Sequence, residues 1–138
     1  MIYEITTESQ FANLLSKFSV VVVDVYATWC MPCQAMSSGY DELAEKFSSL
    51  QVAFAKCDVE KGIIPNIPSV PTINFYINGV LSGEPIRGAD LEGIRARLIN
   101  MGVSPLDDVD DGLSPASMPE SLFRPKRIDK NYKTYGNL

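Results

Sequence analysis

The stretch from Ser19 to Ala27, SVVVVDVYA, is almost entirely apolar and rich in β-branched residues. A strand with one face in solvent alternates apolar and polar residues, whereas a strand buried on both faces is a nearly continuous apolar run. The stretch therefore predicts a central strand of a parallel or mixed sheet. Asp24 interrupts the run, and its pKa should be raised because burial disfavours the charged form of a carboxyl group.

The hydrophobic periodicity on either side of this strand predicts alternating strands and helices. Thr7 and Gln10 form a capping-box pattern at the start of the first helix. We expect further helices from about Cys33 and Asp90, and strands over residues 1–5, 19–27, 51–57, 72–77 and 81–87.

Turn-forming residues predict how the later strands are connected. Asn78-Gly79 is a hairpin signal, so residues 81–87 should return antiparallel to residues 72–77. Gly83 and Pro85 should make that return strand irregular. Between residues 60 and 69, one glycine and two prolines disfavour a long helix and predict a loop with at most one turn.

This order of elements predicts an α/β fold: a central mixed sheet of about five strands, flanked by helices. The last helical pattern stops at Gly102, so we expect one domain over residues 1–102. Residues 103–138 are rich in Pro, Ser, Asp and Gly and lack periodicity. They are expected to form a C-terminal extension, either flexible or docking.

Charge and composition argue against several classes of function. The net charge is -5 and the sequence pI is about 4.6, so nucleic acid is not expected as a partner, because phosphate binding needs a basic surface. The chain has no histidine, which excludes Ser-His-Asp and Cys-His catalysis as well as histidine metal sites. We expect no metal site.

The sequence also predicts a soluble, cytoplasmic protein. Residues 1–10 lack the basic and apolar regions of a signal peptide. No apolar run approaches the roughly 18 residues that a membrane span needs. The chain has three cysteines, which do not fit a framework of structural disulfides.

Two of the cysteines, Cys30 and Cys33, lie two residues apart at the predicted strand-to-helix transition. The first turn of a helix has free N–H groups and the positive end of the helix dipole, and both favour a thiolate at Cys30. Pro32 suits this turn because it has no N–H to leave unpaired. Cys33 should lie one turn into the helix, where the two sulfurs can form a reversible disulfide.

Three alternatives to a redox pair are weaker. Zinc needs about four ligands, and Cys57 is the one other cysteine. A static disulfide that closes such a short loop would add little stability through chain entropy. Inert core thiols fit poorly with the neighbouring Trp29 and Pro32 at a helix start. A C-x-x-C pair next to a βαβ pattern therefore favours redox chemistry.

Several motifs, in the right order, resemble the thioredoxin family. VVVDVYATWCMPC at residues 21–33 is similar to the family's active-site strand and W-C-G-P-C motif. SVPTI at residues 69–73 resembles its cis-proline loop, and NGV and RGAD resemble its hairpin and the glycine before its last helix. The likeness covers residues 1–102, and it implies a thioredoxin fold whose third helix is shortened.

The resemblance implies roles for individual residues. Cys30 is similar to the family's exposed nucleophile and Cys33 to its buried resolving thiol. Asp24 takes the place of the buried aspartate that exchanges a proton with the resolving thiol. Lys56 matches the lysine that pairs with this aspartate, and Pro71 matches the cis-proline that faces the disulfide. Cys57 is additional, and its place in a strand predicts a buried apolar thiol.

A substrate-docking surface is also implied. The Val70 backbone would pair with an extended substrate segment, beside a shallow patch of the following residues: Trp29, Met31, Pro32, Val70, Pro71 and Gly88. Met31 departs from the family's glycine between the cysteines, and its flexible thioether enlarges this patch.

The implied activity is reduction of protein disulfides by a reversible Cys30–Cys33 dithiol. No cofactor would be bound, because the sequence has no nucleotide or flavin motif; electrons would come from NADPH through a separate thioredoxin reductase. The alternative hypothesis is a thioredoxin-fold binding or scaffold module that recruits a partner through residues 103–138. That segment contains Leu122-Phe123 beside a basic cluster, a pattern that could bind a partner protein, dock on its own domain or have no specific role.

Overall fold

The computed structural model describes residues 1–106 of the 138-residue chain. Met1–Val103 form one compact unit. The predicted flexible or docking extension and its tail-binding partner concern residues 103–138. From position 107 onward these residues lie outside the described part. None of the helices in residues 1–106 has both the length and the apolar character of a membrane span.

The centre of the unit is a mixed six-stranded sheet in which the strands follow the order β1-β3-β2-β4-β5, with β6 also paired to β4. β2 is parallel to β3, and β3 to β1, whereas β4 runs antiparallel to β2 and to both short strands. The strands are β1 (Ile2–Ile5), β2 (Val20–Tyr26), β3 (Val52–Asp58), β4 (Thr72–Ile77), β5 (Val80–Leu81) and β6 (Ile86–Arg87). The predicted mixed α/β sheet is confirmed.

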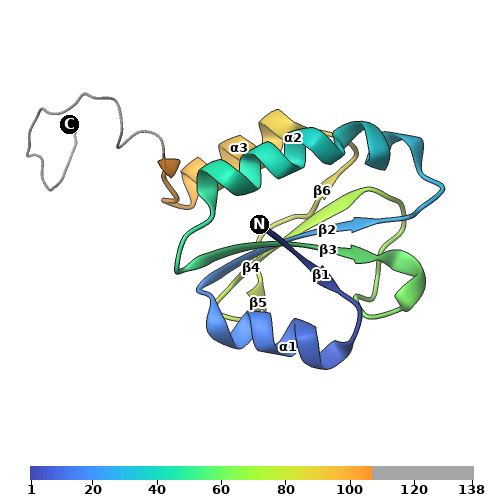
Figure 1. The fold of residues 1–138 in the computed structure, drawn as a ribbon, viewed down its shortest axis with the longest axis horizontal. Coiled ribbons are helices and arrows are strands. Elements are labelled where there is room, and N and C mark those ends of the chain that lie inside the picture. The colour runs from blue at the N-terminus through green and yellow to red at the C-terminus, as the bar shows by residue number, and fades with distance from the viewer. Residues whose placement is uncertain (107–138) are drawn as a thin grey trace, which may run out of the picture. The chain divides into compact units, whose positions relative to one another are not determined.

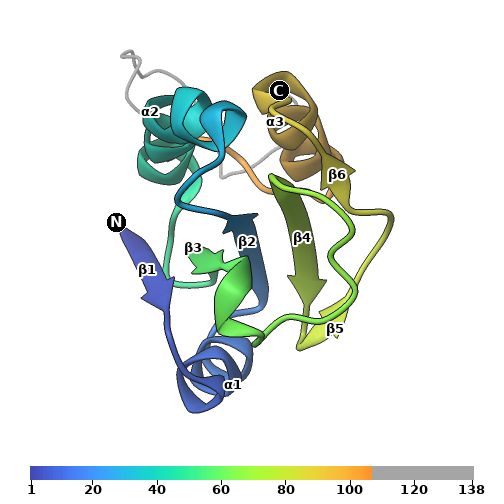
Figure 2. The ribbon, with the colours of Figure 1, turned by 90° about the vertical axis from the view of Figure 1, so that its right-hand side faces the viewer.

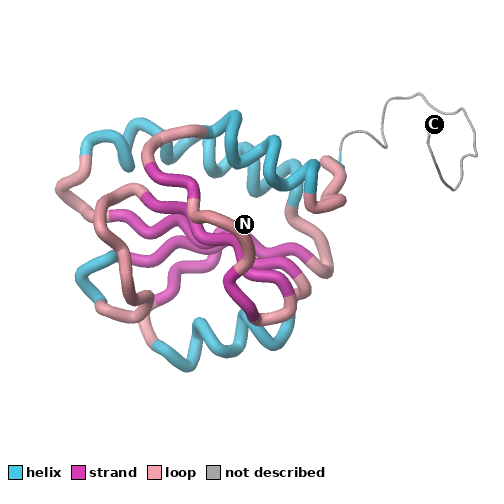
Figure 3. Tube along the Cα trace, turned by 180° about the vertical axis from the view of Figure 1, so that it is seen from behind, coloured by secondary structure: helices cyan, strands magenta, loops and turns pink. Residues whose placement is uncertain are grey.

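Helices cover both faces of this sheet. Figure 1 shows α2 (Met31–Phe47) and α3 (Leu91–Asn100) on one face and α1 (Glu8–Lys17) on the other. The views from the side and from behind show the same two layers around the strands (Figures 2 and 3). α1 begins with the predicted capping box. The Thr7 side chain accepts a hydrogen bond from the Gln10 backbone N–H, and the Gln10 side chain accepts one from the Thr7 backbone N–H.

β2 is the central strand that its sequence predicts. Val22 packs in the core beneath α2 and α3, whereas Val21, Val23 and Val25 pack in the core on the α1 side. Asp24 has the same parity as Val22, so it points toward the α2 face. The apolar run is therefore explained by burial of both faces, and Asp24 is the exception that lies beneath α2.

The irregular segments follow the glycine and proline positions. After β3 the chain makes a single 3-10 turn, η1 (Val59–Lys61), and then runs as a loop to β4, so the third helix is reduced as expected. The predicted return strand over residues 81–87 is divided into β5 and β6, because Gly83, at φ 73, and Pro85 interrupt it. Gly102, at φ 90, follows the end of α3.

Tyr40 ties α2 to the middle of the sheet. Its hydroxyl donates toward the carbonyl oxygens of Val22 on β2 and Ala55 on β3, at 3.1 and 2.8 Å, and the side chain is 1% exposed. We expect Tyr40→Phe to lower the free energy of unfolding by about 1–2 kcal/mol, because a buried hydrogen-bond donor is lost. Urea unfolding measures this effect, with Tyr3→Phe at a half-buried site as the control. Equal stability of the Tyr40 variant and the wild type would contradict it.

Candidate active site

The two cysteines are joined by a disulfide at the point where β2 gives way to α2. Cys30 and Cys33 have Cα atoms 5.3 Å apart. The Cys30 backbone N–H donates to the Ala27 carbonyl at 3.2 Å, which closes the turn between strand and helix. Cys30 is the N-cap of α2. The predicted disulfide, and its place at a helix start, are confirmed.

The start of α2 presents a backbone N–H group to the Cys30 sulfur. The Cys33 backbone N–H lies 3.1 Å from Cys30 Sγ and donates toward it. Met31 and Pro32 are the first two helical residues, so the proline lies where a missing N–H has no cost. In the reduced protein, the same N–H group and the helix dipole favour a thiolate at Cys30 over a thiol.

Burial does not distinguish the two sulfur-bearing residues. Cys30 is 4% exposed and Cys33 is 5% exposed, and both pack with Ala27 against Tyr26, Val59 and Val70. The prediction that Cys30 is the exposed member is wrong for this disulfide form. A disulfide within one helical turn holds both sulfurs against the loop that carries Val70, which a sequence pattern does not reveal.

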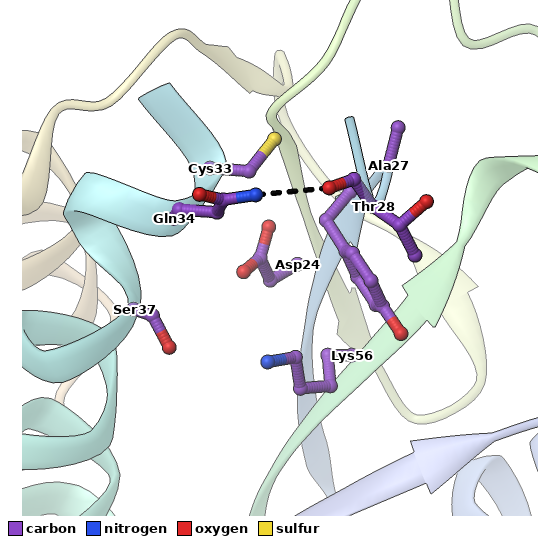
Figure 4. A pocket seen from close by; sticks show the side chains of 8 residues that line it. Asp24, Ala27, Thr28, Cys33, Gln34, Ser37 and Lys56 are labelled. Atoms are coloured by element: carbon purple, nitrogen blue, oxygen red, sulfur yellow. Dashed lines mark hydrogen bonds between the residues drawn. The ribbon is translucent and has the colours of Figure 1, made fainter. Parts of the chain in front are cut away.

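Asp24 lies in a cleft behind the disulfide. The cleft has a volume of about 400 Å³ and is lined by Asp24, Tyr26, Ala27, Thr28, Cys33, Gln34, Ser37 and Lys56. Figure 4 shows the Asp24 carboxyl group between Cys33 and the Lys56 ammonium group, and the Gln34 side chain donating to the Thr28 carbonyl across the cleft at 2.9 Å. The cleft thus connects a carboxyl group to the side of the resolving cysteine.

Burial makes this carboxyl group a weak acid. Asp24 is 2% exposed, and its Oδ1 atom has no hydrogen-bond partner among the described residues. Burial raises the pKa of Asp24 from 3.8 to about 6, while the charge of Lys56 lowers it and that of Glu4 raises it further. The predicted upward direction is confirmed, and Asp24 can both accept and release a proton near neutral pH.

Lys56 is the register partner of Asp24 across the β2–β3 pair. The resemblance predicted that the two side chains pair, but the Lys56 ammonium nitrogen lies 4.9 Å from the centre of the Tyr26 ring, and Asp24 Oδ1 stays unpartnered. The prediction of a direct pair is corrected: Lys56 influences Asp24 through its charge and contacts an aromatic ring instead.

Two large apolar side chains flank the disulfide on its outer side. Trp29 is 65% exposed and Met31 is 73% exposed, so both are available to a partner. The Trp29 indole N–H donates to Glu60 Oε2 at 2.9 Å, which fixes the ring against the turn after β3. Pro32 is also exposed. These three residues form one side of the predicted docking patch.

The other side of the patch comes from the loop before β4. The Val70–Pro71 peptide bond is cis, as the resemblance predicted. Val70 is half-buried and packs against the cysteines, and Pro71 is buried. The Gly88 backbone N–H donates to the Pro71 carbonyl at 2.9 Å, which places Gly88 beside this loop. The structure thus brings Val70, Pro71 and Gly88 to the disulfide side of the sheet.

Four residues of the site are absent from the sequence-based set. They fix the side chains around the disulfide and the cleft: Glu4, Tyr26, Gln34 and Glu60. Tyr26 had a usable signal, because it follows Asp24 by two positions and so shares its face of β2. Glu4 and Glu60 had none, since their roles depend on strand register and on the turn after β3.

The third cysteine lies away from the disulfide. Cys57 is 1% exposed and packs in the core on the α1 side. Burial raises the pKa of its thiol to about 11, so it stays protonated at neutral pH, as expected for a buried apolar thiol. Among residues 1–106, no group of three His, Cys, Asp or Glu side chains is placed to hold a metal ion.

Taken together, the mixed sheet, the disulfide at a helix start and the buried carboxyl group behind it define a thiol–disulfide oxidoreductase. Comparison with known proteins identifies the family. The thioredoxin family model matches residues 2–100, so the chain belongs to the thioredoxin family. Cys30 and Cys33 are its redox-active pair, and the protein is a protein-disulfide oxidoreductase.

Individual relatives agree with this assignment. A thioredoxin of Neurospora crassa is 36% identical over 107 residues, which cover 71% of this chain and 84% of that protein. A thioredoxin of Geodia cydonium is 32% identical over 71% of this chain and 96% of its own length. The oxidised mitochondrial thioredoxin 3 of Saccharomyces cerevisiae superimposes with a TM-score of 0.64 at 30% identity, covering 72% of this chain and 94% of that one.

Proposed function

We propose that this protein works in the reducing direction and that Cys30 makes the first attack on a substrate disulfide. The observation that carries the proposal is the contrast between the two sulfurs. Cys30 Sγ receives the Cys33 backbone N–H at the start of α2, whereas Cys33 lines the cleft that contains Asp24. One sulfur is thus placed to be an anion, and the other is placed beside a proton acceptor.

The reaction then runs in two exchanges. The Cys30 thiolate attacks one sulfur of the substrate disulfide, forms a mixed disulfide and releases the other substrate sulfur as a thiolate. Cys33 loses its proton and attacks Cys30 Sγ, which releases the second substrate sulfur. The substrate gains two electrons and the protein ends with the Cys30–Cys33 disulfide.

In this mechanism Asp24 takes the proton from Cys33, directly or through a water molecule, and Lys56 adjusts its acidity. The pKa of Asp24, about 6, supports this role, because a proton acceptor works best when its pKa is near the working pH. A carboxylate with the ordinary pKa of about 4 would be a weaker base for a thiol.

Substrates would dock on the patch around the disulfide. We assign contacts to Trp29, Met31 and Pro32 on one side and to Val70, Pro71 and Gly88 on the other. An extended substrate segment would pair with the Val70 backbone, and the exposed Trp29 and Met31 would cover apolar side chains next to its disulfide. The partners are therefore proteins with accessible disulfides.

The electrons for each new cycle would come from NADPH through a separate thioredoxin reductase. Membership of the thioredoxin family supports this supply and the absence of a tightly bound cofactor. We also propose a cytoplasmic location, because three cysteines in 138 residues suit a compartment in which thiols stay reduced.

The reduction potential of the Cys30–Cys33 pair tests the direction of electron flow. Equilibration with glutathione buffers, followed by trapping and mass spectrometry, should give a midpoint more negative than about -230 mV, as in reductants of protein disulfides. The Cys57→Ala variant is the control that removes the third thiol. A midpoint near -120 mV, which is typical of strong oxidants, would overturn the reducing direction and leave the family assignment intact.

A further inference from the structure

Three charged side chains form a row across the sheet beneath α2. Glu4 on β1 is in register with Lys56 on β3, and Lys56 is in register with Asp24 on β2. Register partners share a face of the sheet, so a lysine stands between two carboxyl groups. The preceding row on this face, Ile2, Phe54 and Val22, is apolar.

The strand register suggests an ion pair between Lys56 and one of these carboxyl groups, but its ammonium group contacts an aromatic ring. Its ammonium nitrogen lies 4.9 Å from the centre of the Tyr26 ring, in a cation–π contact. The Tyr26 hydroxyl in turn donates to Glu4 Oε2 at 2.8 Å. Glu4 therefore fixes the aromatic ring, and the ring holds the ammonium group.

We propose that Tyr26 is a positioning residue: its ring, fixed by the hydrogen bond to Glu4, keeps the Lys56 ammonium beside Asp24 without letting the two form a direct ion pair. The proposal rests on the proposed role of Asp24 as the proton acceptor for Cys33. Tyr26 follows Asp24 by two positions on β2 and lines the same cleft, so its ring is placed to compete with Asp24 for the ammonium group.

The competition matters because the two arrangements give Asp24 different acidities. An opposite charge in direct contact favours the ionised carboxylate strongly, and the base would then be too weak to take a proton from a thiol. An ammonium held over a neighbouring ring still attracts the carboxylate, but less. The ring thus lets Lys56 balance the burial of Asp24 without cancelling it.

Asp24 faces titratable groups from four elements and an apolar side chain from a fifth. β4 presents the apolar Ile73 as its register partner. The titratable groups near Asp24 come from β1, β2, β3 and α2: Glu4, Tyr26, Lys56, Cys33 and Tyr40. Tyr40 is occupied by the carbonyls of Val22 and Ala55, and Cys33 is in the disulfide, which leaves Lys56 as the positive charge that acts on Asp24.

The test is the titration of the Asp24 carboxyl carbon, followed by carbon-13 NMR in the oxidised full-length chain. Tyr26→Leu and Tyr26→Met both remove the ring, and the midpoint should fall by about one pH unit because Lys56 is released toward Asp24. Tyr26→Phe is the intermediate comparison. It keeps the ring but loses the hydroxyl that bonds to Glu4, so its midpoint should lie between those of the wild type and the ring-deleting variants.

The same substitutions in a Lys56→Met background separate positioning from a general effect of the cavity. Without the ammonium group, loss of the ring should leave the Asp24 midpoint unchanged. An equal fall in both backgrounds would show that water entry causes the shift and would overturn the proposal, as would an unchanged midpoint in both ring-deleting variants. Circular dichroism identifies any variant that fails to fold. Because Tyr26→Leu and Tyr26→Met both remove the ring, either one can replace the other.

The titration needs no substrate and no redox buffer, so its outcome is independent of the reduction potential that tests the direction of electron flow. If the midpoint falls as expected while the protein proves to be an oxidant, the positioning role stands and the proposed direction fails. If the protein reduces disulfides while the midpoint ignores Tyr26, the proposed function stands and the positioning role fails.

Discussion

Replacement of Cys30 by serine is expected to bring the reduction of insulin disulfides by dithiothreitol down to the rate without protein, a loss of about 100-fold or more. The serine hydroxyl is not ionised at neutral pH, so the N–H group at the start of α2 has no anion to stabilise. Turbidity of the released insulin chain measures the rate. A Cys30→Ser variant that retains most of the wild-type rate would rule out Cys30 as the attacking sulfur.

Cys57→Ser is the matched control for this substitution. Cys57 is buried on the α1 side of the sheet and takes no part in the exchange, so the folded variant should reduce insulin at the wild-type rate. Cys33→Ser should still attack and should accumulate a mixed disulfide with the substrate on Cys30, visible by mass spectrometry. Accumulation on residue 33 in the Cys30→Ser variant instead would reverse the assigned order.

Asp24→Asn should stabilise the oxidised protein at pH 8 by about 3 kcal/mol, because the pKa of the folded carboxyl group is about 6 instead of 3.8. The folded protein holds the Asp24 proton at pH values where the unfolded chain has released it. The favourable contribution is therefore complete below pH 3.8 and is lost as the pH rises through 6. Asparagine has no charge to bury and avoids this loss.

Urea unfolding at pH 4 and pH 8 measures this difference, and Asp41→Asn on the exposed surface of α2 is the control. The gain from Asp24→Asn should shrink to about 0.6 kcal/mol at pH 4, because the unfolded carboxyl group is then only partly ionised. The same variant should reduce insulin more slowly than the wild type, since Cys33 loses its proton acceptor. If the free energies of unfolding of variant and wild type run parallel across this pH range, burial does not raise the pKa of Asp24.

Much of the fold could be predicted because local patterns and burial agree. The valines of β2 fill both cores, so a single apolar run was enough to predict a central strand. The Thr7 capping box and the interruption of the return strand at Gly83 are local effects that depend on a few neighbouring residues. The cysteine pair was found for the same reason, since its spacing and the adjacent helix start are both local.

The missed features depend on residues that only the folded chain brings together. Lys56 was assigned to Asp24, but its contact is Tyr26, and that choice depends on Glu4 from the parallel β1–β3 pair. The low exposure of Cys30 depends on the loop with Val70. Strand register and loop placement are set by the whole core, so no periodicity in the sequence reports them.

The proposed exchange depends on the start of α2, which we infer makes the Cys30 sulfur an anion in the reduced protein. The most direct measurement is the rate of Cys30 alkylation by iodoacetamide across pH, with the modified residue identified by mass spectrometry. We predict a midpoint at least about one pH unit below the ordinary cysteine value of 8.5, with Cys57 unmodified in the folded chain. A midpoint at about 8.5 or above would contradict the account.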